Sequence, residues 1–213
     1  MLTSDGIAHK INRIFYSSIS SMSGTALLII AGSRFSYAIV ASGSLFWVSI
    51  ITAFIGTGHH GISSKSKIRM LNVLLSSFAG SIYFFLLYLL NPMLALETSL
   101  ICALSPVFYM RGKFCRSLEH QPADEIFQEA WIEPLTIAGL ILAFSLIREP
   151  LGFATLSIPG GKRGIIELFN TKGSYPYPIQ LISSSVGALF LLAYILVILR
   201  YFEKGKNLSG KTE

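Results

Sequence analysis

The chain has 213 residues, of which 52% are hydrophobic and only 13% are charged, against about 25% charged in an average soluble domain. With a mean hydropathy of +0.61, this composition excludes a disordered chain, a collagen and a small disulfide scaffold, and it predicts a membrane protein. The net charge of +6 does not indicate nucleic-acid binding, because the 17 Lys and Arg residues lie in short runs between apolar segments.

The first half of the chain predicts one broken and two long membrane segments. The polar start lacks the small-residue cleavage site of a signal peptide, so we expect no removed leader. A short apolar run, Thr25–Ala31, stops at Gly32-Ser33-Arg34. Phe35–Gly56 and Ile68–Leu90 are continuous apolar runs of the length that a helix needs to cross a bilayer.

The second half predicts the same order of segments. Met93–Met110 is interrupted by Glu97 and Pro106, and the long runs Trp131–Ile147 and Ile179–Phe202 follow. This pattern predicts an all-α integral membrane protein with six transmembrane segments, in two inverted three-helix repeats whose first helices are broken half-helices. The repeats would cover about residues 19–90 and 92–202 of a single domain, 1–213, with a mobile cytoplasmic tail at 203–213.

Charge asymmetry predicts the orientation. With six crossings, 12 Lys and Arg residues fall on the side of the amino terminus and 5 on the other side, so both termini are expected in the cytoplasm. The longest loop on the opposite side, Glu149–Pro178, holds too many Pro and Gly residues for one helix. Within it we expect at most a partial helix, around Ile165–Phe169.

The two breaks admit two interpretations. Backbone N–H and C=O groups inside the bilayer need hydrogen-bond partners from the protein. Gly32 and Pro106 therefore either end re-entrant pieces that pack together, or they mark a site at the middle of the membrane. Cys102, in the second broken segment, is either a small apolar residue or a thiolate ligand for a metal or iron–sulfur cluster. Cys115, thirteen residues on, is not expected to join it as a ligand.

Ionisable residues within or beside the spans are candidate functional groups. Arg148 and Glu149 close the fifth span and are either an interfacial anchor or functional charges. Glu97 and Glu133 are candidates for cation or proton handling, or lie in the headgroup zone. His59 and His60 have no carboxylate or cysteine nearby in the sequence, and the motifs of soluble nucleotide-binding or hydrolytic enzymes are absent.

The stretch Ile147–Leu156, with Arg148-Glu149, Gly152 and Thr155-Leu156, and the later Glu167-Leu168-Phe169-Asn170-Thr171 resemble the small six-helix membrane subunits of the Rnf and Nqr electron-transport complexes. The resemblance extends to the order of segments over most of the chain. It implies a subunit of the bacterial cytoplasmic (inner) membrane that pairs in the bilayer with a homologous six-helix subunit of opposite orientation.

The resemblance also implies a cofactor. In that family each of the paired subunits gives one cysteine from each half-helix to a 2Fe–2S cluster. Cys102 matches the second cysteine, but the first falls at Thr25 or Gly24, and neither is a thiolate. The motif that follows the second cysteine is also replaced, by Ser105-Pro106-Val107-Phe108-Tyr109. The resemblance thus gives Cys102 as one ligand and Thr25 as the position of the missing one, and an ordinary four-cysteine cluster is not expected.

These observations predict an integral membrane subunit of an Rnf/Nqr-type redox-driven ion translocase, which relays electrons across the membrane or supports that relay. No catalysis is expected from the chain alone. The alternatives are a small secondary transporter or channel-like protein, since transporters also build midplane sites from broken helices, and a non-catalytic assembly subunit.

Overall fold

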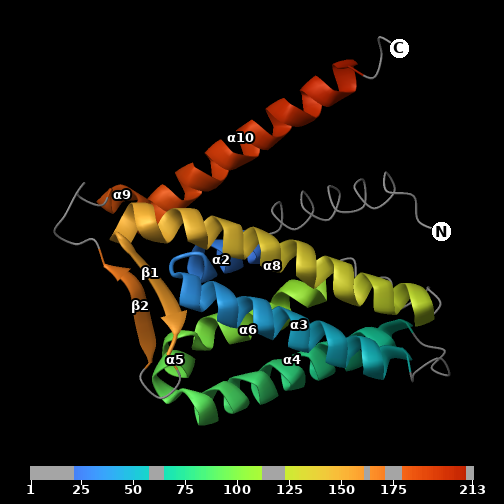
Figure 1. The fold of residues 1–213 in the computed structure, drawn as a ribbon. Helices are drawn as coiled ribbons and strands as arrows, with labels where there is room; N and C mark the ends of the chain where they lie inside the picture. Colours follow the sequence, from blue (N-terminus) through green and yellow to red (C-terminus); the bar gives the residue numbers. More distant parts are fainter. Residues whose placement is uncertain (1–21, 58–64, 112–122, 161–163, 171–178, 210–213) are drawn as a thin grey trace.

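The computed structural model describes residues 22–57, 65–111, 123–160, 164–170 and 179–209, and this part of the chain is mostly helical (Figure 1). The helices of the first half are α2 (Met22–Ala31), α3 (Phe35–Thr57), α4 (Lys65–Leu90), α5 (Pro92–Glu97) and α6 (Ser99–Arg111). The second half contains α8 (Ala123–Phe153), strands β1 (Thr155–Pro159) and β2 (Ile165–Asn170), and helices α9 (Gln180–Ser183) and α10 (Ser185–Ser209).

Three of the helices are long and apolar enough to cross a membrane: Phe35–Phe54 of α3, Met70–Leu90 of α4 and Ala130–Phe153 of α8. They confirm three of the four long spans that hydropathy predicts, and they indicate a multi-pass membrane protein. In α8 the apolar span continues six residues beyond Ile147, so Arg148 and Glu149 lie inside the last turns of the helix and not after it.

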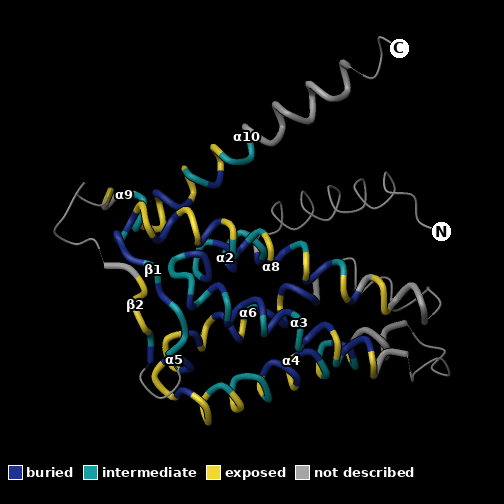
Figure 2. Tube along the Cα trace, viewed as in Figure 1, coloured by how far each residue is buried: buried dark blue, intermediate teal, exposed yellow. Residues whose placement is uncertain are grey.

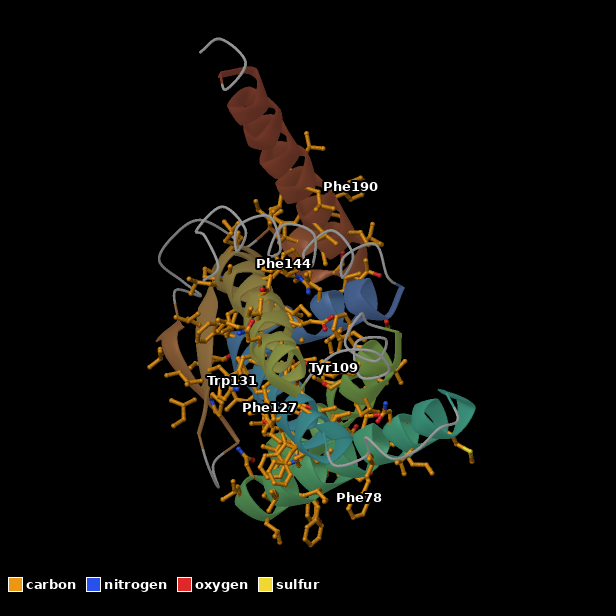
Figure 3. The ribbon with its side chains drawn as sticks, turned by 90° about the vertical axis from the view of Figure 1, so that its right-hand side faces the viewer. Phe78, Tyr109, Phe127, Trp131, Phe144 and Phe190 are labelled. Carbon is orange, nitrogen blue, oxygen red and sulfur yellow. The ribbon has the colours of Figure 1, made fainter. Side chains whose placement is uncertain are left out.

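The helices differ in how far they are covered by protein. Figure 2 shows α3 buried along most of its length, whereas one side of α4 is exposed. Apolar side chains such as Phe78 of α4 and Phe190 of α10 point away from the bundle in Figure 3 and are 64% and 68% exposed. Apolar side chains on the outside and small or polar residues inside are expected of helices that face lipid.

A two-stranded antiparallel hairpin follows α8, so the all-α expectation is wrong at this point. Thr155 pairs with Asn170 and Pro159 with Ile165, with a bulge between Leu156 and Ser157. The apolar stretch for which we expected a partial helix is therefore strand β2, because backbone hydrogen bonds to β1 outweigh a weak local helical preference. The hairpin lies at the end of the bundle where α3 begins and α8 ends (Figure 1).

Three further expectations need correction. The predicted helix Ile179–Phe202 is interrupted at Ser184, which leaves Ser185–Val197 as a shorter apolar helix. The tail predicted to be mobile continues α10 as far as Ser209. Of the two interruptions predicted in the second broken segment, Glu97 does end α5, next to the break at Thr98, but Pro106 lies inside α6 and does not interrupt it.

Pro106 has a packing role in place of a helix break. Its ring approaches Gly80 of α4, where an added Cβ atom would lie 2.6 Å from Pro106 Cγ and 3.4 Å from the carbonyl oxygen of Cys102. Because a proline has no amide hydrogen, it cannot donate the helical bond to the Cys102 carbonyl four residues earlier. The missing side chain at Gly80 lets α4 approach α6 at this turn.

We predict that Gly80→Ala destabilises the bundle by about 1–3 kcal/mol, because the methyl group forces α4 and α6 apart. Gly139→Ala in α8 is the matched control, since nothing lies within 4 Å of its added Cβ atom. It should leave stability unchanged or raise it slightly, because alanine is the better helix former. Thermal unfolding of both variants in detergent measures the difference, and equal stability would contradict close packing at Gly80.

Candidate functional site

The break between α2 and α3 begins with two residues, Gly32 and Ser33, that follow the last residue of α2. Gly32 lies against α8, where an added Cβ atom would be 2.4 Å from Cδ1 of Phe144. Figure 3 labels this phenylalanine among the side chains of α8. The amide and the hydroxyl of Ser33 both donate to the carbonyl oxygen of Ile30, at 3.3 and 2.8 Å, and satisfy one of the last carbonyls of α2. The sequence prediction of a break at Gly32-Ser33-Arg34 is therefore confirmed.

The first amides of α3 are satisfied by distant side chains. The backbone amide of Phe35 donates to Oε2 of Glu149 at 2.7 Å, and the amide of Ser36 donates to Oγ of Ser157 at 3.4 Å. Ser157 in turn donates to the hydroxyl of Ser36 at 3.1 Å. A carboxylate at a helix amino terminus is favoured by the helix dipole and by the free amides of the first turn. Glu149 therefore serves as a long-range cap for α3.

Arg148 donates hydrogen bonds to carbonyl groups at the carboxyl ends of two helices. Its side chain is buried, only 2% exposed, and it donates to four backbone carbonyls. Nη1 donates to Ile29 of α2 at 2.7 Å, and Nε donates to Ile182 of α9 at 3.0 Å. Nη2 donates to Ser183 at 2.9 Å and to Ser184 at 3.2 Å. The planar fork of guanidinium donors suits such a set of acceptors.

The Arg148 bonds tie two helix ends that are far apart in the sequence. The carbonyl of Ile29 belongs to the last turn of α2, and the other three acceptors lie at the break between α9 and α10. At that break the hydroxyl of Ser184 accepts from the amide of Gly187 at 3.1 Å, in the first turn of α10. Helix carboxyl termini carry partial negative charge, so one buried cation stabilises both.

Neighbouring residues of the same motif bring the two breaks close to α8. Gly152 meets the backbone of Ser183, with 3.0 Å between an added Cβ atom and the Ser183 amide nitrogen. The amide of Ile179 donates to the carbonyl of Leu151 at 3.0 Å. Ala154, with a φ of 54°, ends the helix and turns the chain into β1. The motif therefore holds both the break before α3 and the break before α10.

The side chains of Arg148 and Glu149 lie inside the bundle. Both are buried, Glu149 to 1% exposure, and each bonds to backbone of other elements. Their charges satisfy helix ends. Arg34, half-buried in the break, lies 5.9 Å from the ring centroids of both Tyr37 and Phe153, which adds a cation–π contact at the same end of α8.

Cys102 lies apart from this site. It is buried in α6, in a cluster with Val40 and Leu94, and it packs against Tyr83 and other side chains of α3 and α4. It also lines a cavity of about 400 Å³ between α4 and α6. Thr25 of α2 is half-buried. Helices α2 and α6 contact each other, and Leu27 of α2 and Ile101 of α6 belong to the same buried core.

These residues do not fit an iron–sulfur cluster within one chain. A 2Fe–2S cluster needs four ligands, and thiolate is the usual donor. Cys102 is buried among apolar and aromatic side chains, and in the described ranges no three His, Cys, Asp or Glu residues gather where a metal ion could bind. Cys115 lies outside the described residues.

The remaining candidate residues take separate positions. Glu97 is exposed at the end of α5 and accepts a hydrogen bond from the hydroxyl of Tyr37 at 2.8 Å. Glu133 is buried in α8. His59 and His60 lie outside the described residues.

Sequence reasoning missed two serines of the site, Ser157 and Ser184. The sequence carries no sign of the remote amide that Ser157 caps, because Ser36 belongs to another element. Ser184 caps the start of α10 and accepts from Gly187 three residues later, so a serine at that place is a local signal that could have been used.

No protein-family model, curated protein or solved structure matches this chain. The resemblance of Ile147–Leu156 to the Rnf and Nqr membrane subunits therefore stays a prediction.

We predict that Arg148→Met destabilises the protein by at least about 3 kcal/mol, because several buried carbonyls lose a charged donor. Arg148→Lys should also be strongly destabilised, because one ammonium group cannot reach carbonyls on both α2 and α9. The control is Arg34→Met, which removes cation–π contacts and should cost about 1 kcal/mol. Unfolding in detergent measures all three, and equal losses for Arg34→Met and Arg148→Met would contradict this role.

Proposed function

We propose that this chain is an integral membrane subunit of an Rnf/Nqr-type ion-translocating electron-transport complex in a bacterial cytoplasmic membrane. In this proposal it has six crossings in two inverted repeats, both termini in the cytoplasm, and a homologous six-helix partner of opposite orientation. Its role is to support the electron relay by holding the shape of the membrane bundle.

The observation that carries the proposal is the double role of Arg148 and Glu149. The motif on which the resemblance rests contains the two buried charges that cap α2, α3 and α9. Discontinuous helices whose ends are satisfied by protein inside a membrane bundle are typical of ion-coupled membrane transporters. Three apolar helices of bilayer length support the membrane location.

The surroundings of Cys102 favour support over relay. Its thiol packs among aromatic and aliphatic side chains of α3 and α4, and the first cysteine position of the family pattern holds Thr25. A supporting subunit needs the fold and the contact surface but no ligand set. We therefore assign no electron-transfer step to the residues of this chain.

Anaerobic purification of the tagged chain from its native membrane tests the role. We expect it to bring flavin-bearing and six-helix membrane subunits with it. No iron–sulfur EPR signal of the reduced sample should be lost in Cys102→Ala, and Cys115→Ala is the matched control. A signal that only Cys102→Ala removes would overturn the supporting role and establish the relay. Purification without such partners would overturn the proposal as a whole.

The rival function is that of a small secondary transporter, and the buried charges at two helix breaks are the observation that favours it. Solute uptake into vesicles that contain only this chain would support the transporter. A complex that stays together and shows no uptake by the isolated chain would support the subunit.

The proposed orientation makes a separate prediction. A fluorescent-protein fusion at Glu213 should fluoresce, and an alkaline phosphatase fusion within the loop at Lys162 should be active, because the first reporter works in the cytoplasm and the second outside it. The reversed fusions are the controls. Phosphatase activity at Glu213 would contradict an even number of crossings with cytoplasmic termini.

A further inference from the structure

The guanidinium group of Arg34 is held in place by aromatic rings but has unused hydrogen-bond donors. Arg34 is half-buried in the turn between α2 and α3, and its Cζ atom lies 5.9 Å from the ring centroids of both Tyr37 and Phe153. Among the described residues it forms no ion pair and its side chain donates no hydrogen bond, whereas Arg148 donates to four carbonyls. A guanidinium group has five N–H donors, and only acceptor atoms or water can use them.

Arg34 and its two aromatic neighbours lie where two membrane spans end. The apolar span of α3 begins at the next residue, Phe35, and the apolar span of α8 ends at Phe153. Tyr37 lies in the first turn of α3. The ends of membrane spans lie at the level of the lipid headgroups, where tyrosine and arginine side chains are common. The lipid group at this level that matches a guanidinium group is the phosphate.

The charges around this turn favour an anion. Arg34 and Arg148 contribute two positive charges, and Glu149 contributes one negative charge that already caps α3. Glu97 accepts a hydrogen bond from the hydroxyl of Tyr37 at 2.8 Å, but it is exposed, so water and salt screen its charge. The amino end of α3 adds partial positive charge. The charges at the break therefore leave one positive charge uncompensated.

We propose that Arg34 binds the phosphate group of one phospholipid, while Tyr37 and Phe153 hold its guanidinium group in position. The planar fork of N–H donors matches two phosphate oxygens at once. The two rings belong to α3 and α8, so the site is complete only when these helices pack together. A free phosphate ion offers the same oxygens, but it lacks acyl chains that would lie in the bilayer beside the bundle. The site depends on the membrane location of the chain and not on any electron relay.

The test is phospholipid binding by the full chain, purified in detergent and freed of lipid. Native mass spectrometry after addition of phosphatidylglycerol should show one tightly bound lipid per chain. Diacylglycerol with the same acyl chains lacks the phosphate and should bind at least about tenfold more weakly, because charge-assisted hydrogen bonds are lost. Equal binding of the two lipids, or no retained phosphatidylglycerol, would overturn the proposal.

Arg34→Met is the decisive variant and should lower the affinity for phosphatidylglycerol at least about tenfold. Arg34→Lys keeps the charge but loses the paired donors, so its affinity should lie between the two. Arg69→Met is the matched control, because Arg69 also directly precedes an apolar span, Met70–Leu90. It should bind the lipid as the unaltered chain does. Equal losses for Arg34→Met and Arg69→Met would show a general attraction between lipid and cations, and would overturn the proposed site.

Phe153→Leu tests the aromatic contact and keeps the proposal testable if Arg34→Met does not fold. It should weaken lipid binding about two- to fivefold, as the loss of one cation–π contact implies, and unchanged binding would contradict the role of the ring. Inorganic phosphate is the second arm of the experiment. If it displaces phosphatidylglycerol and raises the thermal midpoint by as much, the ligand is free phosphate and the lipid assignment is wrong. None of these results bears on co-purification of the membrane complex, which tests the proposed function separately.

Discussion

One buried guanidinium group determines how the discontinuous helices of this protein meet. A helix that ends inside a bundle leaves carbonyls without donors, and lipid cannot supply any. Arg148 places donors on carbonyls of α2 and of the α9–α10 break, so two helix ends that repel each other electrostatically lie against the same side chain. Removal of this one cation takes charged donors from carbonyls at both helix ends at once.

Glu149 supplies a negative charge next to the positive charge of Arg148, and it caps the amino end of α3. Consecutive residues of α8 supply a positive group to helix carboxyl ends and a negative group to a helix amino end. The two side chains do not need each other as an ion pair, because each lies at a helix end whose partial charge is opposite to its own. The cost of burying two charges is therefore offset by helix dipoles, and Ser36, Ser157 and Arg34 surround the same end of α8.

Hydropathy predicts three of the long helices and the break at Gly32, because a bilayer-length apolar run and a Gly-Ser interruption are local properties. It does not predict the β1–β2 hairpin or the break at Ser184, since strand pairing and side-chain bonds to helix ends leave no mark in a hydropathy profile. The sequence also singles out Arg148 and Glu149 as unusual charges. It cannot reveal their partners, because these are backbone carbonyls and amides, which nearly every residue of the chain has.

Helix α10 has a held part and a projecting part. Its start is held by Arg148 and by the close approach of Gly152 to Ser183, and its residues up to Leu196 pack against α2 and α8. Beyond Leu196 the helix projects from the bundle as far as Ser209 (Figure 1). This projecting part extends over about 20 Å at the rise of an α-helix, so a tilt of about 10° where the packing ends would displace the far end by roughly 3 Å.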